Sequence, residues 1–113
     1  MSLTSLRGRN NFRRVLGRGQ ARRSDGLVLH WAPNGLEENR YATAAKTSTG
    51  CAVVRNRIRR WGRVLLRQWD SEIHAGHDLV VIAHGREAAA SFQNFEFHLD
   101  RVLQKAELKE NVY

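Results

Sequence analysis

The segment from Ala52 to Trp69 constrains the fold more than any other part of the sequence. Wound as an α-helix with 3.6 residues per turn, it places its apolar side chains along one stripe, which is typical of a helix that packs against a core. The stripe consists of Val54, Ile58, Trp61, Leu65 and Trp69. We therefore predict a helix over 52–69 with one side buried.

The opposite side of this predicted helix is almost entirely basic. Arginine recurs at every fourth position, at Arg55, Arg59, Arg63 and Arg67, with Asn56, Arg57 and Arg60 beside them and no acid in the segment. Like charges at this spacing destabilise an isolated helix by about 0.2 to 0.5 kcal/mol per pair, and a merely solvated face would mix signs. Guanidinium groups bind phosphate through paired hydrogen bonds, so the pattern predicts a helix that lies along a nucleic acid backbone.

The basic charge is concentrated in one part of the chain. The 113 residues, enough for one domain, carry a net charge of +8. Residues 1–67 contain 15 basic and 3 acidic side chains, whereas residues 68–113 contain 4 basic and 8 acidic ones. This asymmetry indicates one basic surface, and we interpret residues 1–113 as a single nucleic-acid-binding domain.

The sequence favours a cytoplasmic protein without a membrane association. Cys51 is the only cysteine, so the chain cannot form an internal disulfide and a reducing compartment is expected. The longest apolar run, Leu79 to Ala83, is too short to span a membrane. Arg7 and Arg9 are not followed by the apolar segment that a secretion signal requires.

The remaining elements predict an α+β fold. Residues 1–8 are expected to form a flexible basic arm, and Asn10 or Asn11 to cap a short helix that Gly17 and Gly19 end. Strands are predicted over 27–32, 41–45 and 78–84, the first two as an antiparallel pair. Ser48 or Thr49 could cap the basic helix, and Ser91 a last helix.

The segment AVVRNRIRR, residues 52–60, resembles the signature helix of the bacterial ribonuclease P protein subunit, in which an RNR core precedes one apolar and two basic residues. The likeness extends to both sides of that helix. It includes Leu6, Phe12, Val15, Leu16 and Gly19 near the start, residues 27–31 in a strand, Gly50 before the helix, and residues 78–83 in the strand after it.

This resemblance implies a small α/β sandwich, in which a mixed β-sheet is covered by helices and the arginine-rich helix joins two parallel neighbouring strands by a left-handed crossover. It also implies a non-catalytic protein subunit that binds ribonuclease P RNA and the 5′ leader of precursor tRNA. The RNA would position Mg²⁺ and remove the leader, so no catalytic or metal-binding residue and no obligate protein partner are expected in this chain.

The resemblance also assigns individual residues. Arg55, Asn56, Arg57, Arg59 and Arg60 match the signature helix and would bind RNA. The charge pattern adds Arg63, Arg67, Arg7 and Arg9 to the residues expected to bind RNA. Phe12 would line a leader cleft between the first helix and the sheet, although core packing explains it equally well, and Leu16 takes the place of a second cleft aromatic. His30 stands where the family has a tyrosine, and Lys46 is a leader contact whose orientation the sequence leaves open.

Two other functions fit parts of the sequence. A nuclease could use the carboxylates and imidazoles of Asp70, Glu72, His74, His77 and Asp78, but HAGH lacks the i, i+4 spacing of a helical metal site. A small ribosomal or nucleoid protein fits the charge pattern equally well, because charge alone does not identify which nucleic acid is bound.

Overall fold

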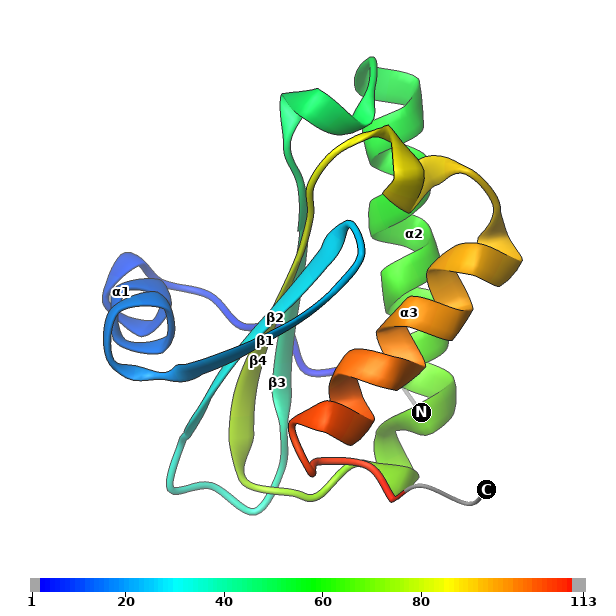
Figure 1. Ribbon diagram of the computed structural model, residues 1–113. Coiled ribbons are helices and arrows are strands. Elements are labelled where there is room, and N and C mark those ends of the chain that lie inside the picture. Colours follow the sequence, from blue (N-terminus) through cyan, green and yellow to red (C-terminus); the bar gives the residue numbers. More distant parts are fainter. Residues whose placement is uncertain (1–2, 111–113) are drawn as a thin grey trace.

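The computed structural model describes residues 3–110 as a mixed sheet with helices on both faces (Figure 1). The helices are α1 (Arg9–Arg18), α2 (Ala52–Trp69) and α3 (Phe92–Lys105), and the strands are β1 (Gln20–Ser24), β2 (Leu27–Pro33), β3 (Arg40–Ala45) and β4 (His77–Ala83). Short 3-10 turns occur at η1 (Thr47–Thr49), η2 (Asp70–Glu72) and η3 (Arg86–Ala89). This architecture confirms the predicted α+β sandwich.

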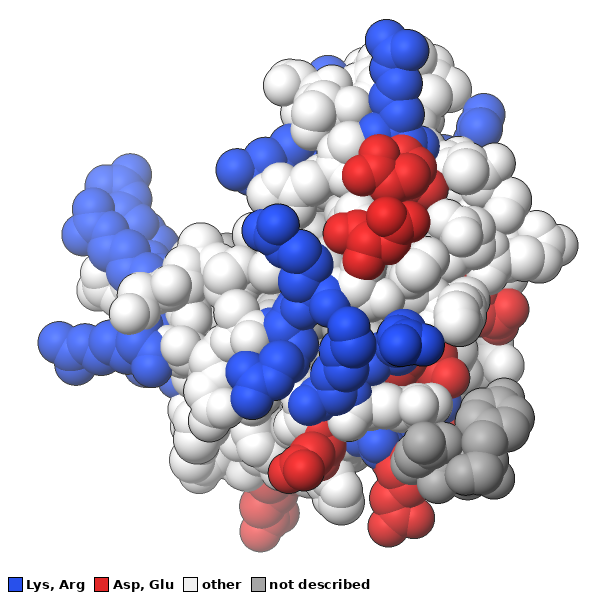
Figure 2. All heavy atoms as spheres, viewed as in Figure 1, with Lys and Arg blue, Asp and Glu red and all other residues white. Residues whose placement is uncertain are grey.

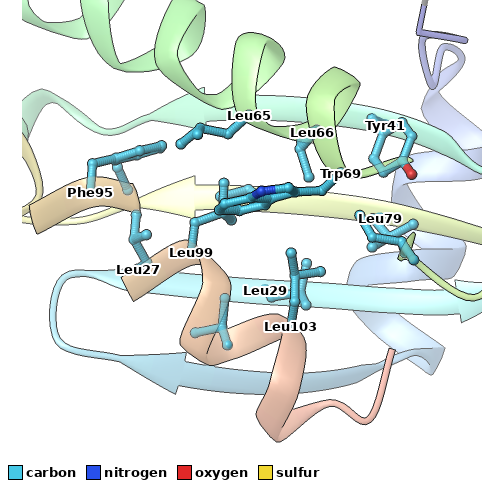
Figure 3. Packing of buried hydrophobic residues seen from close by; sticks show 14 of the residues in the cluster. Leu27, Leu29, Tyr41, Leu65, Leu66, Trp69, Leu79, Phe95, Leu99 and Leu103 are labelled. Carbon is cyan, nitrogen blue, oxygen red and sulfur yellow. The ribbon is translucent and has the colours of Figure 1, made fainter. Parts of the chain in front are cut away.

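The strand order is β1-β2-β4-β3. β2 pairs antiparallel with both β1 and β4, whereas β3 pairs parallel with β4. α2 therefore connects two parallel neighbours, and the path from β3 through α2 to β4 turns in the left-handed sense that the resemblance implied (Figures 1 and 3).

The predicted antiparallel pairing of 27–32 with 41–45 is wrong, because β4 lies between β2 and β3. The segment 34–39 is long enough to carry the chain past one strand position, so a short link did not require adjacent strands. β4 buries Leu79, Val80 and Val81, which point alternately to both faces, and such a strand is most stable in the interior of a sheet.

The main core fills the space between one sheet face and helices α2 and α3 (Figure 3). Leu29 and Leu79 from the sheet, Leu65 from α2 and Leu99 and Leu103 from α3 are completely buried. Burying a leucine side chain contributes about 1.5 to 3 kcal/mol, so this layer supplies much of the stability that holds α2 in place.

A smaller core lies on the opposite sheet face, beneath α1. It consists of Leu6, Val15, Ala32 and Val80, with Phe12, Ala42 and Ile82 packed against it. α1 starts after Gly8 and continues through Gly17 to Arg18, so neither Asn10 nor Asn11 is its cap and Gly17 does not end it. An exposed glycine inside a helix costs about 1 kcal/mol, which the packing of Val15 offsets.

α2 has the predicted bounds, but its cap differs from the prediction. Cys51 occupies the N-cap position without a side-chain hydrogen bond. The Thr49 hydroxyl donates to the Lys46 carbonyl oxygen at 2.6 Å within the preceding turn, and the Ser48 hydroxyl accepts from the Gly85 N–H at 3.0 Å, which joins this turn to the loop after β4. The prediction for α3 is confirmed, because the Ser91 hydroxyl accepts from the Asn94 N–H at 3.0 Å.

Part of the predicted basic arm lies along the outer edge of β3. The Tyr41 N–H donates to the Thr4 carbonyl oxygen at 2.9 Å, and the Leu6 N–H donates to the Tyr41 carbonyl oxygen at 2.7 Å. Leu6 is only 4% exposed. Residues 3–8 thus differ from the loose arm that we predicted, while residues 1–2 of that arm are outside the described residues.

Candidate nucleic-acid interface

The arginines of α2 form a continuous basic surface, which we call the arginine ridge. It comprises Arg55, Arg57, Arg59, Arg60, Arg63 and Arg67. Arg57, Arg60, Arg63 and Arg67 are exposed, and Arg55 and Arg59 are half-buried. Within residues 3–110, none of the six forms an ion pair with an acidic side chain.

The geometry of an α-helix explains why the arginines of the ridge differ in burial. Each step of four residues advances about 40° around the axis, so the ladder turns from the border of the buried face towards solvent. At the buried end, the Arg59 carbonyl oxygen accepts a hydrogen bond from the Thr43 hydroxyl at 3.3 Å, and the Arg59 side chain donates to the Asn56 amide oxygen. Arg55 has a buried Nε without a hydrogen-bond partner.

The N-terminus of α2 adds to the positive potential. Its first turn contains no acidic residue, so the partial positive charge of the exposed N–H groups is not offset. The N–H groups of Val54 and Val53 lower the pKa of the Cys51 thiol below its usual value, with desolvation opposing them. The same donors attract phosphate groups, and the ridge therefore begins at a helix end suited to anions.

Two apolar side chains lie among the arginines. Val53 is 65% exposed and Val64 is 45% exposed. Val53 lines a shallow hollow of about 240 Å³ together with Asn56, Arg57 and Arg60. Exposed apolar groups beside guanidiniums can contact bases or riboses as well as phosphates. The sequence analysis did not identify these valines, because it treated the exposed side only as a basic face.

Phe12 and His30, two of the residues predicted to line a leader cleft, lie on the sheet face that α1 covers. Phe12 is half-buried and packs against the smaller core, whereas Leu16 is 45% exposed. His30 lies on β2 and is half-buried, and Lys46 follows β3 and is exposed. Phe12 thus has a packing role together with an accessible surface, which leaves both interpretations of this residue compatible with the structure.

A second histidine, His84, connects His30 with Lys46. Burial, followed by the charge of His84, lowers the pKa of His30. Burial, followed by the charges of Lys46 and Arg23, lowers the pKa of His84. Lys46 and Arg23 therefore place positive charge near His84, while the lowered pKa values favour the neutral forms of the two histidines. Arg23 and His84 were missed in the sequence because one lies in an unpredicted strand and the other at the end of β4.

α1 is fixed to this face by a buried carboxylate, Asp78. Arg40 donates to it through Nε and Nη2, both at 2.7 Å, Asn34 donates at 3.0 Å, and Arg14 of α1 forms an ion pair with it. Burial alone would raise the pKa of Asp78, but the hydrogen bonds from Arg40 and Asn34 and the charges of Arg40 and Arg14 outweigh it and lower the pKa. Asp78 thus positions α1, and with it Phe12.

The residues of the alternative nuclease site do not converge. Asp70 accepts a hydrogen bond from the Tyr41 hydroxyl, and Asp78 belongs to the network beneath α1. Glu72 and His74 are exposed. Across residues 3–110, no group of three or more such side chains is arranged to share a metal ion.

Arg7 and Arg9, the two basic residues expected to extend the RNA contact, are both exposed at the start of α1. In the view of Figure 2, Lys and Arg side chains project from the region of α1 and the β1–β2 hairpin, with one acidic patch beside the tip of the hairpin and other Asp and Glu side chains towards the lower edge. None of the helices within residues 3–110 has the length and apolar character needed to cross a membrane.

Comparison with known proteins gives a consistent result. Residues 2–107 match the model of the family described as Ribonuclease P. The chain is 32% identical over 108 residues to the ribonuclease P protein component of Caldanaerobacter subterraneus subsp. tengcongensis, covering 96% of this chain and 93% of that protein. It is 28% identical to the component from Syntrophomonas wolfei, covering 91% and 87%.

Solved structures share the fold. The RNase P protein of Staphylococcus aureus superposes with a TM-score of 0.86 at 22% identity, covering 96% of this chain and all of that one. The RNase P protein of Thermotoga maritima superposes with a TM-score of 0.79 at 25% identity, covering 89% and 96%. The relatives are therefore similar over almost their whole length.

Proposed function

Because this chain belongs to the ribonuclease P protein family, we propose that its two basic surfaces bind two different RNAs. As the protein component of a ribonucleoprotein, it has an RNA partner. The arginine ridge would hold the catalytic RNA, and the cleft beneath α1 would hold the single-stranded 5′ leader of precursor tRNA. The whole assembly would then remove the leader and leave the mature 5′ end.

The observation that carries this proposal is the ridge without counter-charges. Six arginines on one helix have no acidic partner among residues 3–110, although the chain contains 11 acidic side chains. Phosphates would neutralise this surface and release the counterions condensed on the RNA, which provides a favourable, salt-dependent free energy. Arginine also suits a backbone contact, since its planar group donates two parallel hydrogen bonds to phosphate.

The cleft has a different chemistry that suits an unpaired strand. Phe12 and the half-buried His30 offer ring surfaces, and Leu16 offers an exposed apolar one. Lys46 and Arg23 add positive charge at the same face. Single-stranded RNA is commonly bound by such a combination, with bases against ring faces and phosphates beside cations.

In this proposal the chemical step belongs to the RNA, and no side chain of the protein takes part in it. Mg²⁺ held mainly by the catalytic RNA would activate water and stabilise the leaving oxygen. The protein would contribute affinity and position, and its positive surfaces would reduce the Mg²⁺ concentration at which the RNA works. Precursor tRNA is processed where it is transcribed in bacteria, so we place the protein in the cytoplasm.

A cleavage assay at low Mg²⁺ tests the function. Purified protein is added to a bacterial ribonuclease P RNA and a precursor tRNA, and the mature 5′ end is measured. We expect the protein to restore cleavage that the RNA alone does not perform under these conditions. If the protein binds the RNA without changing cleavage, a ribosomal or nucleoid-type role would replace this proposal. Cleavage by the protein without RNA would instead support a nuclease.

A further inference from the structure

A small pocket lies where the N-terminal segment, β3 and α2 meet. Its volume is about 200 Å³. The residues that line it are Leu3, Ser5, Leu6, Arg7, Tyr41, Ala42, Thr43, Arg63 and Leu66. Three segments far apart in the sequence therefore build one hollow, and the pairing of Thr4 and Leu6 with Tyr41 holds the first of them in position.

The floor and the rim of this pocket differ in chemistry. Leu6, Tyr41 and Leu66 are buried, and they provide an apolar floor. Arg7 and Arg63 are exposed at the rim, and neither forms an ion pair or donates a side-chain hydrogen bond to another part of residues 3–110. Two guanidinium groups from separate segments therefore flank one apolar hollow, with the hydroxyls of Ser5 and Thr43 nearby.

This combination selects a particular kind of ligand. An inorganic anion would not use the apolar floor, and a purely apolar ligand would not use two cations. A nucleotide has both parts, since its base is flat and largely apolar on its faces and its phosphate suits paired guanidiniums. The volume is below the range of pockets for drug-sized ligands, which fits a single base rather than a larger group.

The position of the pocket indicates where the nucleotide comes from. Arg63 is also part of the arginine ridge, so a phosphate bound at the rim would continue the line of phosphates along α2. An RNA strand on the ridge could therefore insert one unpaired base between the N-terminal segment and α2. The pocket is distinct from the predicted leader cleft, because it is lined by none of the residues assigned to that cleft, which are Phe12, Leu16, His30 and Lys46.

We propose that the pocket between the N-terminal segment, β3 and α2 binds one unpaired nucleotide of the catalytic RNA, with its base on the apolar floor and its phosphate between Arg7 and Arg63. The proposal rests on the proposed function, and it adds a base-binding site to a surface that charge alone would assign to backbone contacts. The N-terminal segment then acts as one wall of an RNA site.

Three variants test this site. Ser5→Phe fills the pocket without changing charge, and Arg7→Ala leaves the pocket open but removes one rim cation. Arg101→Ala is the matched control, because it removes the same charge from an exposed position on α3 that is outside both RNA surfaces. Circular dichroism and thermal unfolding establish that each variant keeps the fold before RNA is added.

The measurement combines affinity with chemical probing of unpaired bases in ribonuclease P RNA. We expect one base to be protected by the wild-type protein and by Arg101→Ala, and to become reactive with Ser5→Phe. Ser5→Phe should weaken binding about tenfold, and so should removal of that single base from the RNA with wild-type protein. Ser5→Phe combined with the RNA that lacks this base should bind no more weakly than either change alone, because both changes remove the same contact. Arg7→Ala should also weaken binding, while leaving the base in place.

Contrary results would separate this site from the general function. If Ser5→Phe binds the RNA with wild-type affinity and protects the same bases, the pocket holds no nucleotide and this inference is overturned, while RNA binding by the ridge stands. If wild-type protein does not bind the RNA at all, the proposed function itself fails.

Discussion

Two groups of arginines in this protein have opposite surroundings. Arg14 and Arg40 both contact the buried carboxylate of Asp78, and Arg40 does so through two hydrogen bonds of 2.7 Å. The six arginines of the ridge have no acidic partner within residues 3–110. The same residue type therefore stabilises the fold at one place and leaves its charge available at another, and the presence of a partner distinguishes the two uses.

This difference predicts that removing the acidic partner of Arg14 and Arg40 destabilises the fold. We expect Asp78→Asn to lower the free energy of unfolding by about 3 to 5 kcal/mol, because it leaves two arginine charges without their buried counter-charge. Urea titration measures this loss. Asp25→Asn is the control, since this carboxylate is 48% exposed in its pair with His98 and should contribute about 1 kcal/mol or less. Equal losses for both variants would contradict the structural role of Asp78.

Replacing ridge arginines should affect RNA binding and leave folding almost unchanged. For Arg59→Ala with Arg63→Ala, we expect the log-log salt dependence of RNA affinity to flatten by roughly 0.7 to 0.9 for each phosphate that the protein no longer binds. The free energy of unfolding should stay equal or rise, by at most about 0.2 to 0.5 kcal/mol for each of the pairs 55/59, 59/63 and 63/67 whose repulsion is removed. A salt slope identical to that of the wild type would mean that these arginines face only water.

The cleft can be separated from the ridge by substrate choice. We expect Phe12→Ala to weaken binding of leader-bearing precursor tRNA by about 1 to 3 kcal/mol, with little effect on mature tRNA, because only the leader offers a base to stack. Phe97→Ala removes a half-exposed aromatic from α3 and serves as the control. Equal losses on both substrates for Phe12→Ala would assign Phe12 to core packing alone.

The loss of folding stability at low pH tests the ion pairs that Asp78 forms with Arg14 and Arg40. The folded-state pKa of Asp78 is lowered, so its contribution to stability is present above the unfolded pKa of about 3.9 and is lost as the pH falls through the folded-state value. We expect stability measured against pH to have a shallower acid limb in Asp78→Asn than in the wild type. Parallel limbs would show that other carboxylates account for the acid dependence.

The smallest expected effect concerns the cleft histidines. The pKa values of His30 and His84 are both lowered in the free protein, so below pH 6.5 the unfolded chain binds more protons and folding stability decreases. A bound leader phosphate favours the charged imidazoles, and we expect leader affinity to rise as the pH falls below 6.5. Leader affinity is measured as a function of pH for the wild type and for His84→Asn. If both proteins have the same pH profile, His84 does not contact the leader.

The sequence predicted those elements whose patterns are local and strong. α2 has the predicted bounds because its apolar stripe and arginine ladder repeat with one helical period. β4 and α3 were found for the same reason, from a continuous apolar run and from a Ser91 cap followed by helical spacing.

The errors concern contacts between distant segments. β1 was missed because four of its five residues are exposed and two are arginines, which does not resemble a strand. The length of the link between β2 and β3 does not reveal that β4 lies between them. The pairing of residues 4–6 with Tyr41 also has no local sequence signal, because it joins segments that are far apart in the chain. Likewise, Arg23 and His84 join the cleft only through the fold, since 61 positions separate them in the chain.

Gly62 lets α2 pack closely against β3. A Cβ atom at this position would lie 2.7 Å from the Thr43 methyl carbon, which is closer than such atoms approach in proteins. Positions 43 and 62 should therefore vary together during evolution, with alanine at 62 accompanied by serine at 43, which lacks the methyl group and keeps a hydroxyl for the Arg59 carbonyl oxygen. A larger residue at position 62 without the change at position 43 would push α2, and every arginine on it, away from the sheet.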